Sequence, residues 1–456
     1  MGMHLLSKPR RFSLAVLCLV TFWYISQFPG RLGFDNSEII RMLRSGRSTD
    51  WWSSEFFWYM KIFSFDGRFI FLLSALQAVL LTLYLVKFIR IFIEKKNVQN
   101  FVILAALANP IFGNMAVNVS HDTFIVIGVL SIVTDNIRHF RGIKGAINSP
   151  ILNYLVSFVG LVSLTFSSLG KIILISQVVF LFITRRMNFR NLGTLALVAV
   201  ISLTSFVNVD HYDKTHINQL LVFDLKCIAQ HEQAEISELQ WSTLESFAPQ
   251  EEWKTPVSCK LGDAQVAVMP NLNYRDLGKL ARIYFELVKQ NPAIVLQAHF
   301  QRASQALPPP FFYGPENQVV RDPNIPVGLG SNNALQQGTE LLHPSVDEPS
   351  VNIKVKLFYP FEVVAQTLIF IVNQASWFWG WGGLWLYPIL SFYILKGRLN
   401  RIIPELFPIA ILHLSLLVIG PGPFGRYVLT TILLGYILLA AQLYEFITKR
   451  KKERDS

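Results

Sequence analysis

The residues best suited to chemistry in this sequence are acidic side chains that follow apolar segments. Asp35 lies in the segment that opens with Pro29 and Gly30, directly after the first apolar stretch, and Glu38 follows nearby. A carboxylate held by such a turn can act as a general base or ligate a cation, so we assign Asp35 to catalysis and Glu38 to substrate binding. Asp35 through Ser37 are also good helix-capping residues, and local chemistry leaves that alternative open.

A second polar pair, His121 and Asp122, forms part of the very short turn between two apolar segments. Such a pair can ligate a metal ion or orient a phosphate-bound substrate, so we assign Asp122 to catalysis and His121 to substrate binding. The same residues at the start of a helix can instead cap it and compensate its dipole, and the local pattern favours that interpretation.

Two basic residues, Lys171 and Arg426, lie at the ends of apolar segments on the same predicted side of the membrane. Each can clamp a lipid-linked phosphate at headgroup level, or can simply extend its charge out of the bilayer. Arg426 is the more telling of the two, because the Gly422–Tyr427 turn is rich in Gly and Pro and places the guanidinium in a defined position. Tyr427, beside it, joins the predicted substrate-binding set.

Apolar segments of membrane-spanning length must position these residues. Of the 456 residues, 52% are apolar and only 16% are charged, whereas an ordinary soluble domain carries about 25% charged residues. A spanning helix needs about 20 mostly apolar residues. The sequence therefore predicts an all-α polytopic membrane protein with ten transmembrane helices: Phe12–Phe28, Phe69–Ile93, Phe101–Val117, Thr123–Ile137, Ile151–Ser167, Ile172–Ile183, Leu192–Val207, Trp377–Leu395, Ile402–Ile419 and Tyr427–Phe446.

The distribution of Lys and Arg sets the predicted orientation. If ten spans alternate, the basic residues gather on one side, which is then cytoplasmic and holds both termini. The net charge of +11 is explained by basic residues that face the anionic lipid headgroups on this side. We therefore expect no nucleic-acid partner. The basic residues that define this side are Lys8, Arg10, Arg11, Lys95, Lys96, Arg138, Arg141, Lys144, Arg185, Arg186, Arg190, Lys396, Arg398, Arg401 and those from Lys449 to Arg454.

The chain divides into three predicted parts: an N-terminal membrane module (1–207), an extracytoplasmic domain of helices and long loops (208–356), and a C-terminal membrane module (357–456) that begins with an interfacial helix. The first outer loop, 29–68, contains two amphipathic segments that we expect to lie along the membrane surface, the second rich in aromatic residues from Trp51 to Tyr59. In the outer domain, Asp276 to Gln290 has helical spacing. Cys227 and Cys259 both fall in this domain and form a candidate disulfide.

Several well-known motifs are missing from the sequence. It has no Walker loop, no Rossmann glycine pattern, no CxxC pair and no HExxH helix. This argues against an ATP-driven pump, a cytoplasmic enzyme that binds nucleotide sugars and a zinc protease.

Short motifs occur along the chain in an order that resembles the GT-C class of polytopic glycosyltransferases, in particular its less-characterised bacterial members. Each motif is short, so the specificity lies in their order and in the topology. The motifs are Phe28–Pro29–Gly30 with Asp35, Asp50–Trp51–Trp52, Leu76–Gln77, Asn109–Pro110 with Asp122, Phe223–Asp224–Leu225, Asn291–Pro292 with Arg302, and Gly425–Arg426–Tyr427.

The resemblance implies an inverting enzyme of the bacterial cytoplasmic membrane. It would move a hexose or pentose from a polyprenyl-phosphate donor to a glycan or lipid-linked acceptor on the extracytoplasmic side, in cell-envelope polysaccharide synthesis. Asp35 would be the general base, and Asp122 would match a second acid that in some members binds a divalent metal, Mg²⁺ or Mn²⁺, together with Asp35. Lys171 and Arg426 would match basic residues near the donor phosphate.

The chain also departs from the family pattern. Trp51–Trp52–Ser53 stands where such proteins often have a His-Pro pair, and the second outer loop has His121–Asp122 in place of a DxD or ExD motif. Both departures weaken the expectation of a metal and of a particular substrate. A flippase and a polymerase of lipid-linked saccharides remain as alternatives, although the predicted spans contain few ionisable residues, mainly Asp135 and His413.

Overall fold

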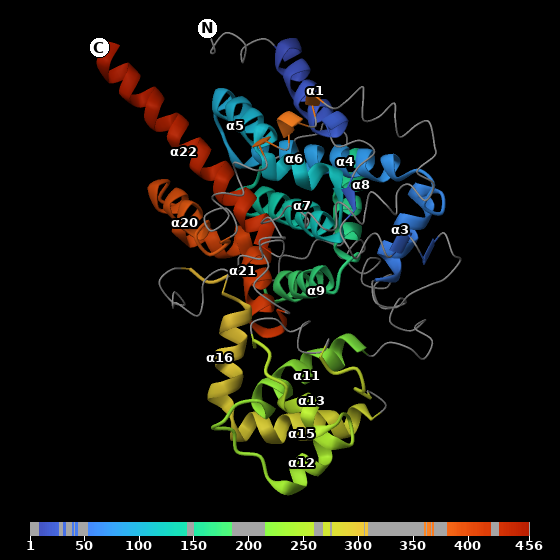
Figure 1. Ribbon diagram of the computed structural model, residues 1–456. Coiled ribbons are helices and arrows are strands. Elements are labelled where there is room, and N and C mark those ends of the chain that lie inside the picture. Colours follow the sequence, from blue (N-terminus) through green and yellow to red (C-terminus); the bar gives the residue numbers. More distant parts are fainter. Residues whose placement is uncertain are drawn as a thin grey trace. The chain divides into compact units, whose positions relative to one another are not determined.

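The computed structural model (Figure 1) describes most of the chain as helices. Asp35, Glu38, Arg426, Tyr427 and the predicted span Leu192–Val207 lie outside the described residues. The residues described are 9–26, 31–32, 39–40, 42–43, 53–143, 150–184, 215–259, 268–273, 276–304, 306–308, 360–361, 363–365, 367–368, 381–420 and 428–455.

The chain forms two compact units. The first contains Met1–Val207, Arg321–Leu412 and Gly425–Ser456, and the second contains Asn208–Val320 and His413–Phe424. The helix α21 (Ile402–Ile419) therefore begins in the first unit and ends in the second.

The first unit consists of long apolar helices and one very short strand pair. Its elements are α1 (Pro9–Ser26), β1 (Arg31–Leu32), α3 (Ser54–Ser64), α4 (Ile70–Phe92), α5 (Lys96–Ala108), α6 (Pro110–Val117), β2 (Asn118–Val119), α7 (His121–Arg141), α8 (Pro150–Leu164), α9 (Ser168–Ile183), α20 (Leu386–Leu395), η3 (Leu399–Arg401), the first part of α21, and α22 (Leu429–Asp455).

Four helices in the described part of the chain are long and apolar enough to cross a membrane. They are Phe71–Phe92, His121–Arg141, Leu399–Ile419 and Leu429–Arg450, and the bent pair α5 and α6 would be a fifth. Shorter apolar helices occur at Ile151–Leu164, Ser168–Ile183 and Leu386–Leu395. The described residues therefore agree with the predicted all-α membrane protein. The predicted count of ten spans is not confirmed.

The third predicted span, Phe101–Val117, is not one straight helix. α5 and α6 meet at a bend of 63° at Asn109 and Pro110. Proline has no backbone N–H and its ring clashes with the preceding turn, so a continuous helix is broken there. The side chain of Asn109 accepts a hydrogen bond of 2.8 Å from the backbone N–H of Ile111 and so caps the new helix.

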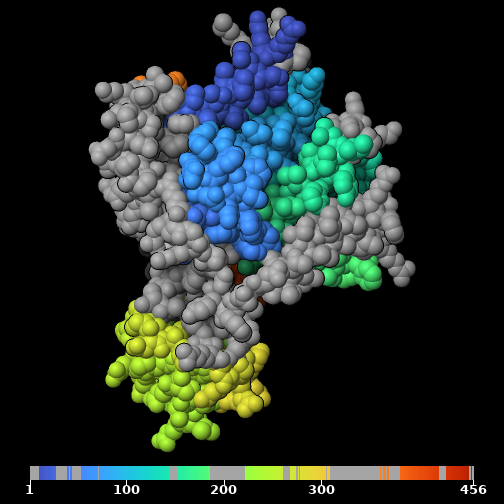
Figure 2. Space-filling model, turned by 90° about the vertical axis from the view of Figure 1, so that its right-hand side faces the viewer, coloured from blue at the N-terminus to red at the C-terminus, as the bar shows by residue number. Residues whose placement is uncertain are grey.

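α7 is the most buried of the spanning helices. In its most apolar window 78% of the residues are buried, against 39% for α21, and it packs against both α4 and α8. Gly128 on α7 and Gly160 on α8 lie where an added methyl group would collide with the partner helix. Small residues at such a crossing allow two backbones to approach closely. Figure 2 shows another face of the molecule, where the blue surface of α3 and α4 borders the green surface of α8.

The C-terminal end of α7 carries a buried ion pair. Arg141 donates two hydrogen bonds to Glu405, of 2.7 and 2.6 Å, and Glu405 is completely buried. The hydroxyl of Tyr393 donates a third, of 2.7 Å, to the same carboxylate. This network joins α7, α20 and α21 at the predicted cytoplasmic side.

The second unit is a small helical domain with its own core. It comprises α11 (Thr215–Ala229), α12 (Glu238–Glu245), α13 (Gln250–Lys254), α15 (Leu277–Gln290) and α16 (Pro292–Arg302), with the end of α21. The helix predicted from Asp276 to Gln290 is confirmed, and Asp276 caps it. The core is formed by apolar residues of these helices, among them Val222, Leu225, Leu244, Trp253, Leu280 and Leu287.

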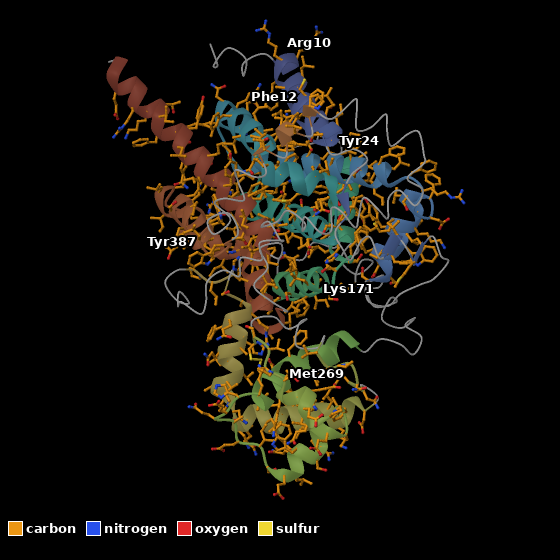
Figure 3. All side chains as sticks on the ribbon, viewed as in Figure 1. Arg10, Phe12, Tyr24, Lys171, Met269 and Tyr387 are labelled. Atoms are coloured by element: carbon orange, nitrogen blue, oxygen red, sulfur yellow. A yellow bond between two sulfur atoms is a disulfide. The ribbon has the colours of Figure 1, made fainter. Side chains whose placement is uncertain are left out.

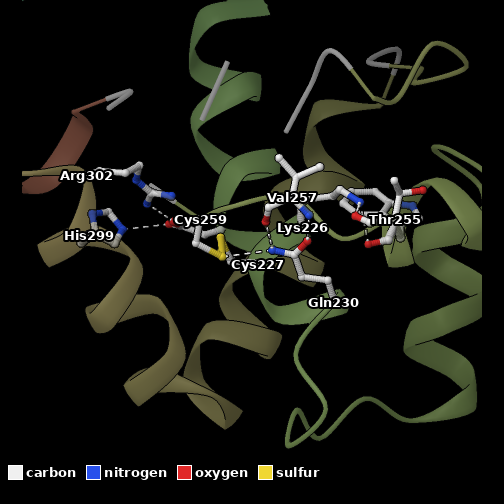
Figure 4. The surroundings of a disulfide bond; sticks show 10 residues. Lys226, Cys227, Gln230, Thr255, Val257, Cys259, His299 and Arg302 are labelled. Carbon is white, nitrogen blue, oxygen red and sulfur yellow. Dashed lines mark hydrogen bonds and ion pairs between the residues drawn. A yellow bond between two sulfur atoms is a disulfide. The ribbon is translucent and has the colours of Figure 1, made fainter. Parts of the chain in front are cut away.

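Two neighbouring residues of α11 tie the following loop to this core (Figure 4). Cys227 is joined to Cys259 by a disulfide, with the Cα atoms 5.7 Å apart. The ammonium group of the buried Lys226 donates to the carbonyls of Glu252, Trp253 and Thr255 at the end of α13. A cation at a helix C-terminus is favoured by the exposed carbonyls there.

Candidate functional site

The turn between α6 and α7 is held in place by Gln77 of α4. Gln77 is completely buried, and its amide nitrogen donates to the carbonyls of Met115 and Asn118, both at 2.7 Å. Its side-chain oxygen accepts a bond of 3.1 Å from the backbone N–H of Ser120. The Gln77 amide thus donates two hydrogen bonds and accepts one, and these three bonds fix the backbone that leads into His121 and Asp122.

The same turn pairs with the first predicted outer loop. β1 runs parallel to β2, with Arg31 opposite Asn118 and Leu32 opposite Val119. Parallel strands leave their ladder in the same direction. Asp35 is the third residue after Leu32, and Asp122 is the third after Val119. The pairing therefore brings together the two chain segments that lead to the predicted catalytic acids.

Asp122 lies in the first turn of α7, where the helix dipole favours a negative charge. Ser120 is the helix cap: its hydroxyl accepts from the N–H of Asp122 at 3.1 Å and donates to Oδ2 of the same residue at 3.3 Å. Because Ser120 performs the capping, the carboxylate of Asp122 is not needed for it. Asp122 is only 6% exposed.

Three buried polar atoms in this turn lack a hydrogen-bond partner within the described part of the chain. They are Oδ1 of Asn118, Nδ1 of His121 and Oδ1 of Asp122. Oδ1 of Asp122 lies 3.5 Å from Nε2 of His121. Buried oxygens without donors are costly unless a proton or a cation neutralises them. Two such oxygens in one turn fit a cation that prefers oxygen ligands.

The aromatic helix α3 packs against this turn. The ring of Phe56 makes an edge contact with the His121 ring, with centroids 5.7 Å apart. Phe56 and Tyr59 also contact Phe124 of α7 and Phe166 of the turn before α9, with Tyr59 and Phe124 at 4.8 Å. Burial raises the pKa of Tyr59. The segment that we expected along the membrane surface thus has a buried face, formed by Phe56, Tyr59 and Met60.

Lys171, in the first turn of α9, forms an ion pair with Glu55 of α3 (Figure 3). The distances from Nζ to the two carboxylate oxygens are 3.0 and 3.1 Å, and both side chains are nearly buried. Lys171 is therefore close to the His121 turn, because Glu55 precedes Phe56. Sequence reasoning missed Glu55; the signal was an acid in the first turn of an otherwise aromatic helix.

Two residues of the predicted substrate-binding set, Arg426 and Tyr427, follow α21 and precede α22 in the sequence. The structure describes the chain up to Gly420 and again from Val428, which is completely buried. No group of three His, Cys, Asp or Glu side chains suited to a metal occurs among the residues whose placement is described. A cation at Asp122 would thus require a further ligand, and Asp35 is the sequence candidate.

A separate polar centre occurs in the second unit, around Asp224 of α11. Tyr284 donates to Asp224 at 3.0 Å, His299 lies 2.9 Å from it, and Arg302 forms an ion pair with it. Burial raises the pKa of this carboxyl, but the His299 hydrogen bond and the charge of Arg302 outweigh it, so the pKa lies below the ordinary value. Asp224 and Arg302 come from two motifs far apart in the sequence, and the fold joins them.

Two solved structures are similar to this chain. One is the crystal structure of ArnT from Cupriavidus metallidurans bound to undecaprenyl phosphate, with 13% identity, a TM-score of 0.34, and coverage of 94% of this chain and 77% of that one. The other is the same protein in the apo state, with 14% identity, a TM-score of 0.30, and coverage of 93% and 76%. No protein-family model and no curated protein matches the sequence.

Proposed function

We propose that this protein is a membrane glycosyltransferase of the GT-C type. It moves a sugar from a polyprenyl-phosphate donor to a hydroxyl of a glycan or lipid-linked acceptor on the extracytoplasmic side. The observation that supports the proposal is the parallel pairing of Arg31–Leu32 with Asn118–Val119. In the sequence, Asp35 is the third residue after Leu32 and Asp122 is the third after Val119. If Asp35 joins Asp122 and His121, two carboxylates and a histidine suit a reaction that removes a proton and expels a phosphate.

In the proposed reaction, the acceptor oxygen attacks the anomeric carbon from the face opposite the phosphate. Asp35 takes the proton of the acceptor hydroxyl as the new carbon–oxygen bond forms. The bond between the anomeric carbon and the phosphate oxygen breaks, and polyprenyl phosphate leaves with the electron pair. One such displacement inverts the configuration at the anomeric carbon, and no covalent intermediate with the enzyme is needed.

A divalent cation fits the residues around Asp122. The buried oxygens of Asn118 and Asp122 that lack donors among the described residues are suitable ligands for Mg²⁺ or Mn²⁺, and Asp35 would complete the set. When bound, such an ion supplies positive charge for the departing phosphate. In this arrangement Asp122 and Asn118 would hold the ion, and His121 lies beside the Asp122 carboxylate.

Positive side chains would complete the phosphate site. Arg426 is our candidate for the direct clamp, because its guanidinium can donate two parallel hydrogen bonds to a phosphate. Lys171 is paired with Glu55, so its charge is already balanced. It can bind the donor phosphate only if the phosphate competes with the Glu55 carboxylate.

A lipid-linked saccharide flippase is the second candidate. The observation that favours it is Lys87, which is only 7% exposed within the spanning helix α4 and lies 3.7 Å from Asp135 of α7. Buried ionisable residues inside spans often mark transport pathways. A flippase would move a sugar lipid across the bilayer and form no new glycosidic bond, which separates the two functions experimentally.

The test uses the full-length protein in lipid nanodiscs with a panel of radiolabelled polyprenyl-phosphate sugars and a cell-envelope acceptor extract. We expect Asp35→Asn to lower transfer by about 10²–10⁴-fold, which is the usual contribution of a general base, at unchanged abundance. Asp66→Asn is the matched control, because Asp66 is an exposed acid of the same loop. Undiminished transfer by Asp35→Asn would remove Asp35 as the base. Translocation without any transfer would favour the flippase.

A further inference from the structure

His299 of α16 joins two acceptors that come from different helices. Its Nε2 lies 2.9 Å from the Asp224 carboxylate, and its Nδ1 lies 2.9 Å from the carbonyl oxygen of Leu417 near the end of α21. A neutral imidazole has one N–H and can donate only one of these bonds.

The Leu417 carbonyl lacks its usual helical donor because of the residue at position 421. In an α-helix it would accept from the N–H four residues later, but that residue is Pro421, which has no N–H. The neighbouring carbonyl of Leu416 is satisfied by Gly420, at 2.9 Å. His299 can therefore supply the donor that Pro421 lacks, as basic side chains near a helix C-terminus often do.

The residues around His299 hold it in this position. Asp224 is 2% exposed and is bound by Tyr284 and Arg302 as well as by His299. A second contact joins the same two segments, because His413 lies one turn before Leu417 and its Nδ1 is 2.5 Å from the carbonyl of Ala306. All of these residues belong to the second unit.

We propose that His299, held by Asp224, is a positioning residue that clamps the end of α21, the helix that in the sequence precedes the segment carrying Arg426. The clamp itself depends only on the contacts of the second unit, whereas its effect on Arg426 rests on the proposed transferase function. The groups that face His299 are Asp224 of α11 and Leu417 of α21, with Tyr284 of α15 and Arg302 of α16 bound to the same carboxylate; His413 of α21 contacts Ala306 instead.

Hydrogen–deuterium exchange of the full-length protein tests the clamp directly. We expect His299→Ala to raise the exchange rates of the amides from Leu416 to Gly420 by about tenfold or more, because the Leu417 carbonyl loses the side chain that binds it. His231→Ala is the matched control, because His231 is an exposed histidine of the same unit, and it should leave these amides unchanged. Unchanged exchange at the end of α21 in a folded His299→Ala protein would overturn the clamp.

A second variant keeps the proposal testable if His299→Ala disturbs the whole unit. The amide nitrogen of His299→Gln can take the place of Nε2 and keep the bond to Asp224, but this side chain has no group in the place of Nδ1. It should therefore speed exchange at Leu416–Gly420 while α15 stays protected. Slow exchange at Leu416–Gly420 in His299→Gln would overturn the clamp.

Transfer kinetics then test the consequence for the donor. We expect His299→Gln to raise KM for the polyprenyl-phosphate sugar about tenfold or more with a smaller change in kcat, because the base and the acceptor site are untouched. An unchanged KM together with faster exchange would confine His299 to holding α21. A wild-type protein with no transfer would remove the proposed function and leave the exchange result intact.

Discussion

The side-chain oxygen of Gln77 accepts a hydrogen bond from the backbone N–H of Ser120, the residue that caps α7, at 3.1 Å. This single contact connects the middle of α4 to the turn that carries His121 and Asp122. Together with the two bonds from its amide nitrogen to Met115 and Asn118, it makes Gln77 the side chain that positions the candidate site.

Gln77→Leu should therefore reduce both stability and transfer. Two carbonyls and one N–H would lose their buried partner, at a cost of about 2 kcal/mol or more. We expect lower resistance to SDS-induced unfolding and a fall in kcat/KM per folded molecule. Gln177→Leu is the control, because Gln177 is also buried and forms an amide pair with Asn136. It should lose stability but keep its transfer rate; equal losses of transfer in the two variants would contradict the positioning role.

The Glu55–Lys171 pair predicts a strong energetic coupling. Either single change, Glu55→Gln or Lys171→Met, removes the ion pair between two nearly buried side chains and should destabilise the protein by about 3 kcal/mol. The double variant should recover much of this loss. SDS unfolding of all four proteins measures the coupling, and additive single effects would show that the pair contributes nothing.

The Arg141–Glu405 network should matter for stability and not for chemistry. Glu405→Gln weakens a completely buried bidentate pair and should cost about 3–5 kcal/mol. Asp122 and Arg141 are about 29 Å apart along α7 at the usual rise per residue, so transfer per folded molecule should stay unchanged. Glu94→Gln is the control, since its pair with Arg398 is exposed and should contribute less than about 1 kcal/mol.

Asp224 predicts a loss of stability at acid pH. Burial opposes its charge, but His299 and Arg302 hold its pKa below the ordinary value in the folded state. A depressed folded pKa contributes stability that is present above the unfolded pKa of about 3.9 and is lost as the pH falls through the folded pKa. Exchange in α15 should therefore accelerate below about pH 4. Asp224→Asn should show less of this pH dependence, whereas Asp276→Asn, which keeps a good capping residue, should retain it.

Much of the secondary structure was predictable from the sequence, because helix length and apolar composition are local properties. The span predicted at Phe69–Ile93 appears as Ile70–Phe92, and α21 has the predicted bounds Ile402–Ile419. The bend at Asn109–Pro110 also had a local signal, the proline, but the surrounding apolar residues led to the prediction of one continuous span. The count of ten spans is not confirmed by the four or five that the described residues contain.

The sequence alone determined the apolar helices and the acidic and basic residues at their ends, because each depends on residue types within one short segment. Only the tertiary structure decided which of them meet. Gln77 and Ser120 are 43 residues apart, Glu55 and Lys171 are 116 apart, and Asp224 and His299 are 75 apart. Whether two such side chains face each other depends on helix rotation and crossing angle, which arise from packing the whole chain and leave no signal in either segment.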